Sequence, residues 1–174
     1  MGSDSSDRPH IAELVDSVVR AEKRFMGTPS WRKGQRDDEL RFDWPVEVGD
    51  LLSGCYVAVT AYPGLRGERF TINFVVMKHC IWRLDYELEN KKHTNPLDRA
   101  PALGAFVVTG RSYHAWGDNR EFATRSTLPR ELPCARLLPA NVHGWENAFR
   151  WFCGELRIAQ PASVPSWPET MRLL

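Results

Sequence analysis

Residues 69–88 read RFTINFVVMKHCIWRLDYEL, and this stretch decides the fold class. Its first half alternates apolar Phe70, Ile72 and Phe74 with Thr71 and Asn73. Its second half alternates again, with two sets of side chains: Cys80, Trp82, Leu84 and Tyr86 in one, and Ile81, Arg83, Asp85 and Glu87 in the other. A period of two places neighbouring side chains on opposite faces of a β-strand. The stretch therefore predicts two half-buried antiparallel strands.

The segments on either side extend this pattern. Val- and Tyr-rich residues 54–62 predict a strand before it, and residues 105–114 predict one after it. Gly117, Asp118 and Asn119 predict a turn, after which residues 120–125 pair back as a hairpin. The expected sheet thus covers residues 54–125 and has about five strands.

Helical periodicity flanks the sheet. Apolar residues recur every three to four positions over residues 9–26, and again over residues 141–158, where one face consists of Trp145, Ala148, Phe149, Phe152 and Leu156. Because strands and helices do not alternate along the chain, the pattern predicts the α+β class. We expect an antiparallel sheet of about five strands with an N-terminal helix and a C-terminal helix packed on it.

The length of 174 residues predicts one domain. We expect a disordered leader at residues 1–8, a single α+β domain at 9–160 and a Pro-rich tail at 161–174. Residues 28–50 contain Gly, Pro and the isolated Trp31 and Trp44, which favours a long loop anchored by tryptophans, or else a packed connector.

Composition excludes several classes of protein. The chain is 43% hydrophobic and 26% charged with a net charge of +1, so it has no overall field that attracts nucleic acid, although a local basic patch is compatible with this balance. No apolar run is long enough to span a bilayer and the N-terminus is acidic, which favours a cytoplasmic protein without a membrane partner. Nucleotide-binding glycine motifs and Cys-x-x-Cys pairs are absent, so we expect no cofactor.

The densest group of chemically capable residues lies in two segments, 93–96 and 111–120. Histidine moves protons near neutral pH, and a guanidinium binds phosphate. We therefore predict that His93, His114 and Arg111 or Arg120 act on a phosphodiester, with one group as base, one as acid and one as cation. The alternative is that these residues are turn-forming and edge-strand polar residues.

Other residues are candidate binding groups. Arg83 and Asp85 share a strand face, where they bind a ligand, pair with each other or face solvent. Tyr113 and His114 must point to opposite faces of their strand, so one of them is structural. A site of two histidines with Asp85 or Glu87 is an alternative for metal binding, but its spacing matches no standard motif. The remaining candidate contacts for bases or for a partner protein are Asn95, Trp31 and Trp116.

Short motifs carry a resemblance. Trp82-Arg83-Leu84-Asp85, His93-Thr94-Asn95-Pro96 and Tyr113-His114-Ala115-Trp116 resemble an uncharacterised bacterial domain family with an Arg-Leu-Asp strand, a His-x-Asn-Pro loop and a later histidine strand. Their order is also similar to that of the TumE-like toxins of toxin–antitoxin modules. The chain departs from that pattern at Ala115 and Trp116, where a second histidine is expected. The resemblance implies a toxin–antitoxin or phage-defence context.

Two functions follow as hypotheses. The first is a toxin-like or phage-conflict protein that acts on RNA as a metal-independent ribonuclease. The second is a non-catalytic protein-binding inhibitor, antitoxin-like or anti-defence protein, which uses exposed tryptophans and a sheet edge. The partner is accordingly RNA or a protein.

Overall fold

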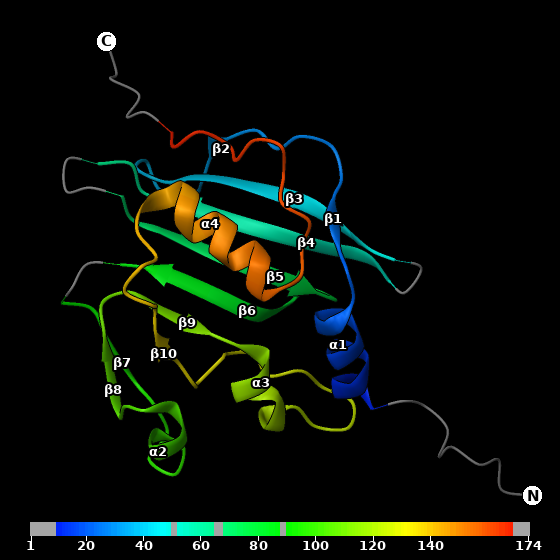
Figure 1. Cartoon of the computed structure of the whole chain (residues 1–174), viewed down its shortest axis with the longest axis vertical. Coiled ribbons are helices and arrows are strands. Elements are labelled where there is room, and N and C mark those ends of the chain that lie inside the picture. Colours follow the sequence, from blue (N-terminus) through cyan, green and yellow to red (C-terminus); the bar gives the residue numbers. More distant parts are fainter. Residues whose placement is uncertain (1–9, 50–51, 65–67, 88–89, 169–174) are drawn as a thin grey trace, which may run out of the picture.

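The computed structural model describes residues 10–49, 52–64, 68–87 and 90–168; the predicted leader and the last six residues of the tail lie outside these ranges. An antiparallel sheet dominates the fold (Figure 1), with strands in the order β1-β3-β4-β5-β6-β9-β10 and β2 paired with β3. Its strands are β1 (Arg24–Phe25), β2 (Arg32–Lys33), β3 (Leu40–Val48), β4 (Leu52–Ala61), β5 (Phe70–Val76), β6 (His79–Tyr86), β9 (Ser112–His114) and β10 (Arg136–Leu137). A separate two-stranded sheet contains β7 (Lys92–Thr94) and β8 (Val107–Thr109).

The α+β class and the mostly antiparallel sheet are confirmed, but the expected count of five strands is wrong. The largest omission is β3, which runs through the predicted tryptophan loop. Its core-facing side chains alternate at Phe42, Trp44 and Val46, while Pro45 lies exposed between them. Proline cannot donate a ladder hydrogen bond, so its presence argued against a strand. Here the Pro45 carbonyl instead accepts a bond from the backbone N–H of Met26.

The predicted strand over residues 105–114 is divided between the two sheets. β8 pairs with β7, whereas β9 pairs with β6, and Gly110 at φ 80° turns the chain between them. A positive φ is accessible to glycine without steric cost, so this residue permits the break. The predicted hairpin at residues 120–125 is also wrong, because the short helix α3 (Trp116–Asn119) and the 3₁₀ turn η1 (Arg120–Phe122) take its place.

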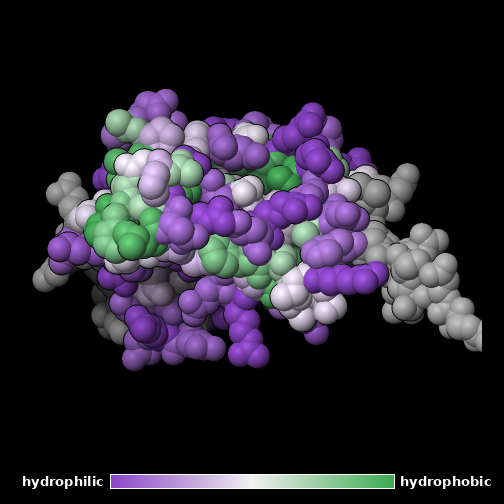
Figure 2. Space-filling view, turned by 90° about the horizontal axis from the view of Figure 1, so that it is seen from below, coloured by the Kyte–Doolittle hydropathy of each residue, from purple (hydrophilic) through white to green (hydrophobic). Residues whose placement is uncertain are grey.

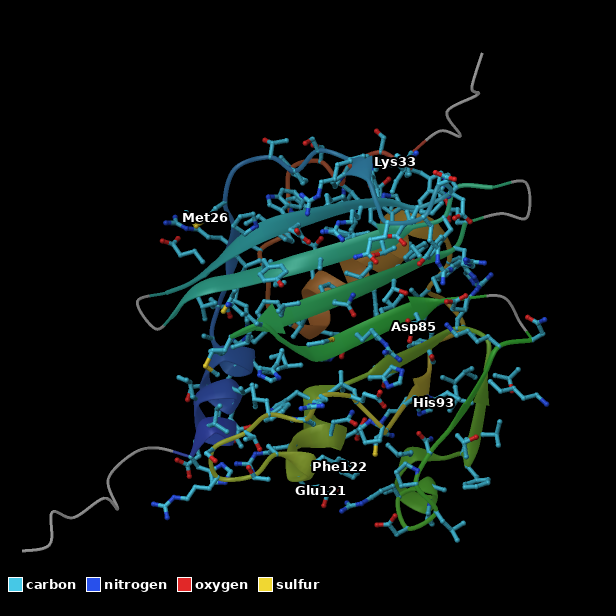
Figure 3. All side chains as sticks on the ribbon, turned by 180° about the vertical axis from the view of Figure 1, so that it is seen from behind. Met26, Lys33, Asp85, His93, Glu121 and Phe122 are labelled. Atoms are coloured by element: carbon cyan, nitrogen blue, oxygen red, sulfur yellow. The ribbon has the colours of Figure 1, made fainter. Side chains whose placement is uncertain are left out.

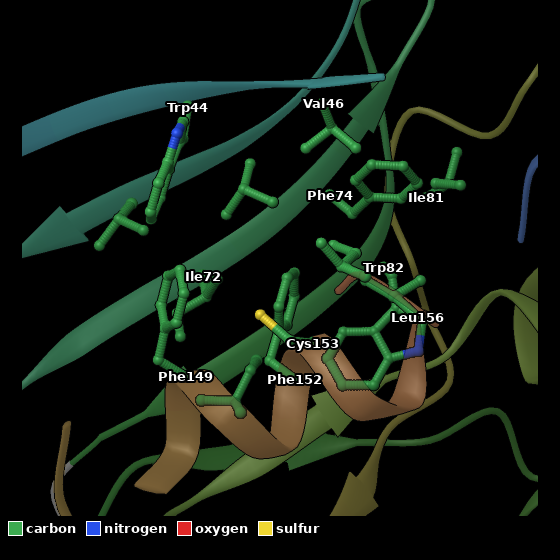
Figure 4. Close-up of a cluster of buried hydrophobic side chains, with 14 of the residues drawn as sticks. Trp44, Val46, Ile72, Phe74, Ile81, Trp82, Phe149, Phe152, Cys153 and Leu156 are labelled. Atoms are coloured by element: carbon green, nitrogen blue, oxygen red, sulfur yellow. The ribbon is translucent and has the colours of Figure 1, made fainter. Parts of the chain in front are cut away.

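The two long helices are shorter than predicted. α1 covers Ile11–Arg20, and the chain then enters β1 instead of continuing as helix to residue 26. α4 covers Gly144–Glu155 and lies across one face of the sheet, and the short α2 covers Ala100–Leu103. Figure 4 shows Phe149 and Phe152 of α4 packed against Ile72 and Trp82 of the sheet. The predicted core face of the last helix is confirmed.

A β-bulge changes the alternation in β6. The pairing with β5 shifts after Phe74↔Trp82 to Val75↔Cys80, which leaves Ile81 as the extra residue. Cys80 therefore joins the polar face, where its Sγ lies 3.4 Å from Asn73 Oδ1, and Ile81 is buried in the core. The predicted face assignment holds from Trp82 onward and is wrong for Cys80 and Ile81, because sequence alternation does not register an inserted residue.

The elements are arranged so that the two faces of the sheet differ. α4 covers one face, and Figure 3 shows the opposite face of β3, β4, β5 and β6 in front of that helix. The unit of β7, β8 and α2 lies beyond β9, at one edge of this second face. None of the helices in the described part of the chain has the length and apolar character that crossing a membrane requires.

Candidate functional site

A cavity of about 50 Å³ lies between β6, β9 and β7, on the sheet face opposite α4. Strand register places Arg83 opposite His114 and Asp85 opposite Ser112. Figure 3 shows Asp85 on β6 and His93 on the neighbouring β7. The full lining is Arg83, Asp85, Glu87, Lys91, Lys92, His93, Gly110, Ser112 and His114. The two histidine segments, separated in sequence, thus meet at one site.

The two imidazoles are in contact. Their ring centroids lie 4.8 Å apart with the planes at 89°. His114 Nε2 lies 3.0 Å from Arg83 Nη2 and 3.3 Å from Asp85 Oδ2. Arg83 Nε in turn donates to Asp85 Oδ2 at 2.8 Å. Two imidazoles, a guanidinium and a carboxylate therefore form one network.

Backbone carbonyls fix the protons on both rings. His114 Nδ1 lies 2.7 Å from the Leu132 carbonyl oxygen, and His93 Nε2 lies 2.9 Å from that of Pro133. A carbonyl oxygen only accepts, so these nitrogens carry the hydrogen in the neutral rings. The unprotonated nitrogens are then His114 Nε2, which accepts from Arg83, and His93 Nδ1.

Burial sets the charge state of the network. Burial lowers the pKa of His114; the contact with Asp85 opposes this, while the charge of Arg83 and a charge on His93 lower it further. Burial raises the pKa of Asp85, but a hydrogen bond from His114, when that ring is protonated, and the charge of Arg83 outweigh it, so the pKa lies below its ordinary value. The Thr71 hydroxyl also donates to Asp85, at 3.1 Å. A neutral His114 therefore faces an ionised Asp85 at neutral pH.

The same histidines help to hold a backbone segment, residues 132–135, which we call the clamped segment. Side chains bind four consecutive residues of it: His114 binds Leu132, His93 binds Pro133, Asn119 binds Cys134 and Asn95 binds Ala135. Each asparagine makes two bonds to its residue, because its amide oxygen accepts from the backbone N–H and its Nδ2 donates to the carbonyl. An asparagine amide thus replaces a strand partner.

Asn95 is therefore a structural residue and not a ligand-binding one, which corrects the prediction. Its side chain is 1% exposed, and a third bond, from Nδ2 to the Ala105 carbonyl, uses its remaining donor. Sequence reasoning missed Asn119, which was assigned to a turn. Asn119 ends the short helix α3, and only the fold places it, like Asn95, beside the clamped segment.

The guanidinium at the histidines is that of Arg83, not that of Arg111 or Arg120. Arg120 binds Asp16 of α1, with Nε 2.8 Å from Oδ2. Arg111 lies over the Tyr86 ring, 4.2 Å from its centroid, and its Nη1 is 3.5 Å from His143 Nδ1. Neither arginine lines the cavity. The sequence does not give strand order, so it did not show that Arg83 is the cross-strand partner of His114.

The aromatic candidates lie away from the cavity. Tyr113 faces α4 and stacks on Trp82 with centroids 5.5 Å apart, which confirms that it and His114 point to opposite faces. Trp116 is 3% exposed and donates to Asp16 at 2.7 Å, so the prediction that it is exposed is wrong. Trp31 is half-buried, and its indole N–H donates to the Ser166 carbonyl of the C-terminal segment. These tryptophans hold chain segments together.

Within the part of the chain that the structure describes, no three or more His, Cys, Asp or Glu side chains are grouped so that they could hold a metal ion. Comparison of the chain with protein-family models, with curated proteins and with solved structures gives no match. The resemblance to TumE-like toxins therefore stays a prediction, and function is argued from the cavity.

Proposed function

We propose that the cavity is an acid–base site that cleaves RNA without a metal, and that the chain is a toxin-like or phage-conflict protein. One observation carries the proposal: His93 and His114 lie with ring centroids 4.8 Å apart, and the Arg83 guanidinium lies 3.0 Å from His114, at a single cavity. Cleavage of a ribose phosphodiester needs a base, an acid and a cation for the developing charge. These three side chains supply that set.

His93 and His114 each carry out one of the two proton transfers. Neutral His114 acts as the base: its Nε2 takes the proton of the ribose 2′-hydroxyl, and the 2′-oxygen then forms a bond to phosphorus. Protonated His93 acts as the acid: it gives its proton to the 5′-oxygen as the bond from phosphorus to that oxygen breaks. The products are a 2′,3′-cyclic phosphate and a 5′-hydroxyl. A charge on His93 lowers the pKa of His114, which keeps the His114 ring available as the base.

Arg83 serves the phosphate. Its side chain is 36% exposed, so the guanidinium is free to turn from His114 Nε2 toward a non-bridging oxygen, which also releases Nε2 for catalysis. Asp85 stays bonded to Arg83 Nε and positions it. At the rim Lys91 pairs with Glu87 at 2.6 Å, and the exposed Lys92 adds positive charge. The cavity volume suits one phosphate group, with the nucleosides outside it.

The test uses purified protein, single-stranded RNA and excess chelator. Wild type should give fragments that end in a cyclic phosphate, and Arg83→Ala and His93→Ala should lower the rate by about 100-fold or more. The matched control is His143→Ala, because His143 is an exposed histidine outside the cavity. The proposal would be refuted if wild type left the RNA intact. It would also be refuted if the Arg83→Ala and His93→Ala variants cleaved RNA at the wild-type rate.

A second observation favours a protein-binding role as the alternative. Exposed apolar residues gather over α2 and β8 at one end of the molecule (Figure 2), where Leu97 is 77%, Phe106 48% and Val107 42% exposed. Contiguous exposed apolar surface is typical of an interaction site. We propose that a non-catalytic inhibitor or antitoxin-like protein would use this patch, not the tryptophans. The effect of the protein on cells that express it would then be lost in Leu97→Asp and kept in His93→Ala.

A further inference from the structure

The face of β3, β4, β5 and β6 that is turned away from α4 leads directly into the cavity. Core-facing residues of β4 such as Val57 and Val59 are fully buried, whereas Tyr56, Ala58 and Thr60 between them point to the other face and are half-buried. Figure 3 shows this face in front of the helix layer. An antiparallel sheet that is polar on one face and apolar on the other commonly has a solvated face.

Two rows of paired residues cross this face and end in the cavity. One row runs Asp43, Ala58, Asn73, Arg83 and His114, and the other runs Arg41, Thr60, Thr71, Asp85 and Ser112. Neighbouring strands lie about 4.8 Å apart, so β4 is about 14 Å from His114. A ligand whose phosphate occupies the cavity therefore continues across these rows if it is longer than one or two residues.

We infer that single-stranded RNA lies across this face, with a base stacked on Tyr56 and its backbone near Arg41, and that the face selects single strands for the cavity. Tyr56 lies beside the first row, two residues from Ala58, in a third row that runs from β3 to β6 through Pro45, Tyr56, Val75 and Cys80. The choice of RNA rests on the proposed function. Single strands are bound by aromatic side chains on which bases stack and by cations that follow the backbone. Asn73, Thr60 and Thr71 add groups that hydrogen-bond to base edges or to the 2′-hydroxyl.

The charges on the face support this occupant. The acidic groups on the face and at the cavity each have a cation: Asp43 pairs with Arg32, Glu47 with Arg24, Asp85 with Arg83 and Glu87 with Lys91. Arg41 lies beside Arg32 in the β2–β3 pair and makes no ion pair with any residue that the structure describes. The face therefore carries a cation in excess, and a polyanion supplies its counter-charge.

The binding test is independent of cleavage. The probe is a short single-stranded 2′-O-methyl RNA, which lacks the attacking hydroxyl, and binding is followed by fluorescence anisotropy. Tyr56→Ala should weaken binding by about tenfold and Tyr56→Phe should retain it, because stacking needs the ring and not the hydroxyl. Arg41→Ala should weaken binding and reduce its salt dependence. The control is Arg150→Ala, which removes the same charge from α4 on the other side of the sheet.

Cleavage assays separate this inference from the proposed function. A dinucleotide reaches only the cavity, so Tyr56→Ala should slow cleavage of a long RNA and leave dinucleotide cleavage unchanged. Equal binding by wild type, Tyr56→Ala and Arg41→Ala would overturn the inference, even if the protein cleaves RNA. Tyr56-dependent binding without any cleavage would support the inference and refute the ribonuclease proposal.

Discussion

Replacing Asn95 by alanine should destabilise the protein by about 3 kcal/mol, because the change removes three buried hydrogen bonds, each worth about 1 kcal/mol. The bonds join Asn95 to the Ala135 N–H at 2.7 Å, to the Ala105 carbonyl at 2.8 Å and to the Ala135 carbonyl at 2.9 Å. Alanine leaves these backbone groups unpaired at a site that is 1% exposed. For a chain of this length, the melting temperature should fall by about 9 °C.

Urea unfolding followed by tryptophan fluorescence measures this loss as a lower midpoint at an unchanged slope. Asn119→Ala should lose a similar amount, because Asn119 makes two bonds to Cys134 of the clamped segment and a third to the Ala115 carbonyl, all of 2.8 to 3.0 Å. The control is Asn141→Ala, at an exposed position, which should change the unfolding free energy by less than about 0.5 kcal/mol. A loss below about 1 kcal/mol for Asn95→Ala would refute the stabilising role assigned to the bonds between Asn95 and the clamped segment.

Three further predictions concern buried polar groups. Because the pKa of His114 is lowered, the unfolded chain takes up a proton near pH 6.5 before the folded chain does, so stability is full above that pH and falls below it, by up to about 1.4 kcal/mol per pH unit. Urea midpoints across this range should have a flatter pH dependence in His114→Asn. Lys23 is 3% exposed and its Nζ donates to the carbonyls of three residues, so Lys23→Met should lose about 2 kcal/mol in the same assay. Trp116→Phe removes the indole bond to Asp16 and should lower the unfolding free energy by about 1 kcal/mol, measured by urea titration at neutral pH.

Local patterns predicted the elements whose partners lie close in sequence. β5 and β6 form a hairpin, so their alternation alone set which residues face α4, apart from the residues at the bulge. The apolar stripe of α4 was equally clear, because Trp145, Phe149 and Phe152 recur at helical spacing and are all buried. Burial of one face fixes such patterns whatever the order of the other strands.

The parts that depend on distant pairing were not predictable in this way. β3 pairs with β1 and β4. Pairing with these two strands keeps the segment in a strand although Pro45 cannot donate a ladder hydrogen bond. Arg83 lies at the two histidines because β9 pairs with β6, and the insertion that contains β7 and β8 separates these two strands in the sequence. The clamped segment lies beyond both, and its side-chain partners come from β7, β9 and α3, which are distant from it in sequence.

The hydrogen bonds to the clamped segment also determine which variant tests catalysis separately from stability. His93 and His114 each use one ring nitrogen to hold the clamped segment and both line the cavity, so replacing either ring removes a structural bond together with a candidate proton carrier. Arg83 makes no hydrogen bond to the clamped segment, and among the described residues its side chain bonds to Asp85 and His114 alone. A loss of RNA cleavage in Arg83→Ala at unchanged urea midpoint therefore points to the chemistry of the cavity. The same loss in His93→Ala has that meaning only after the stability of the variant has been matched to wild type.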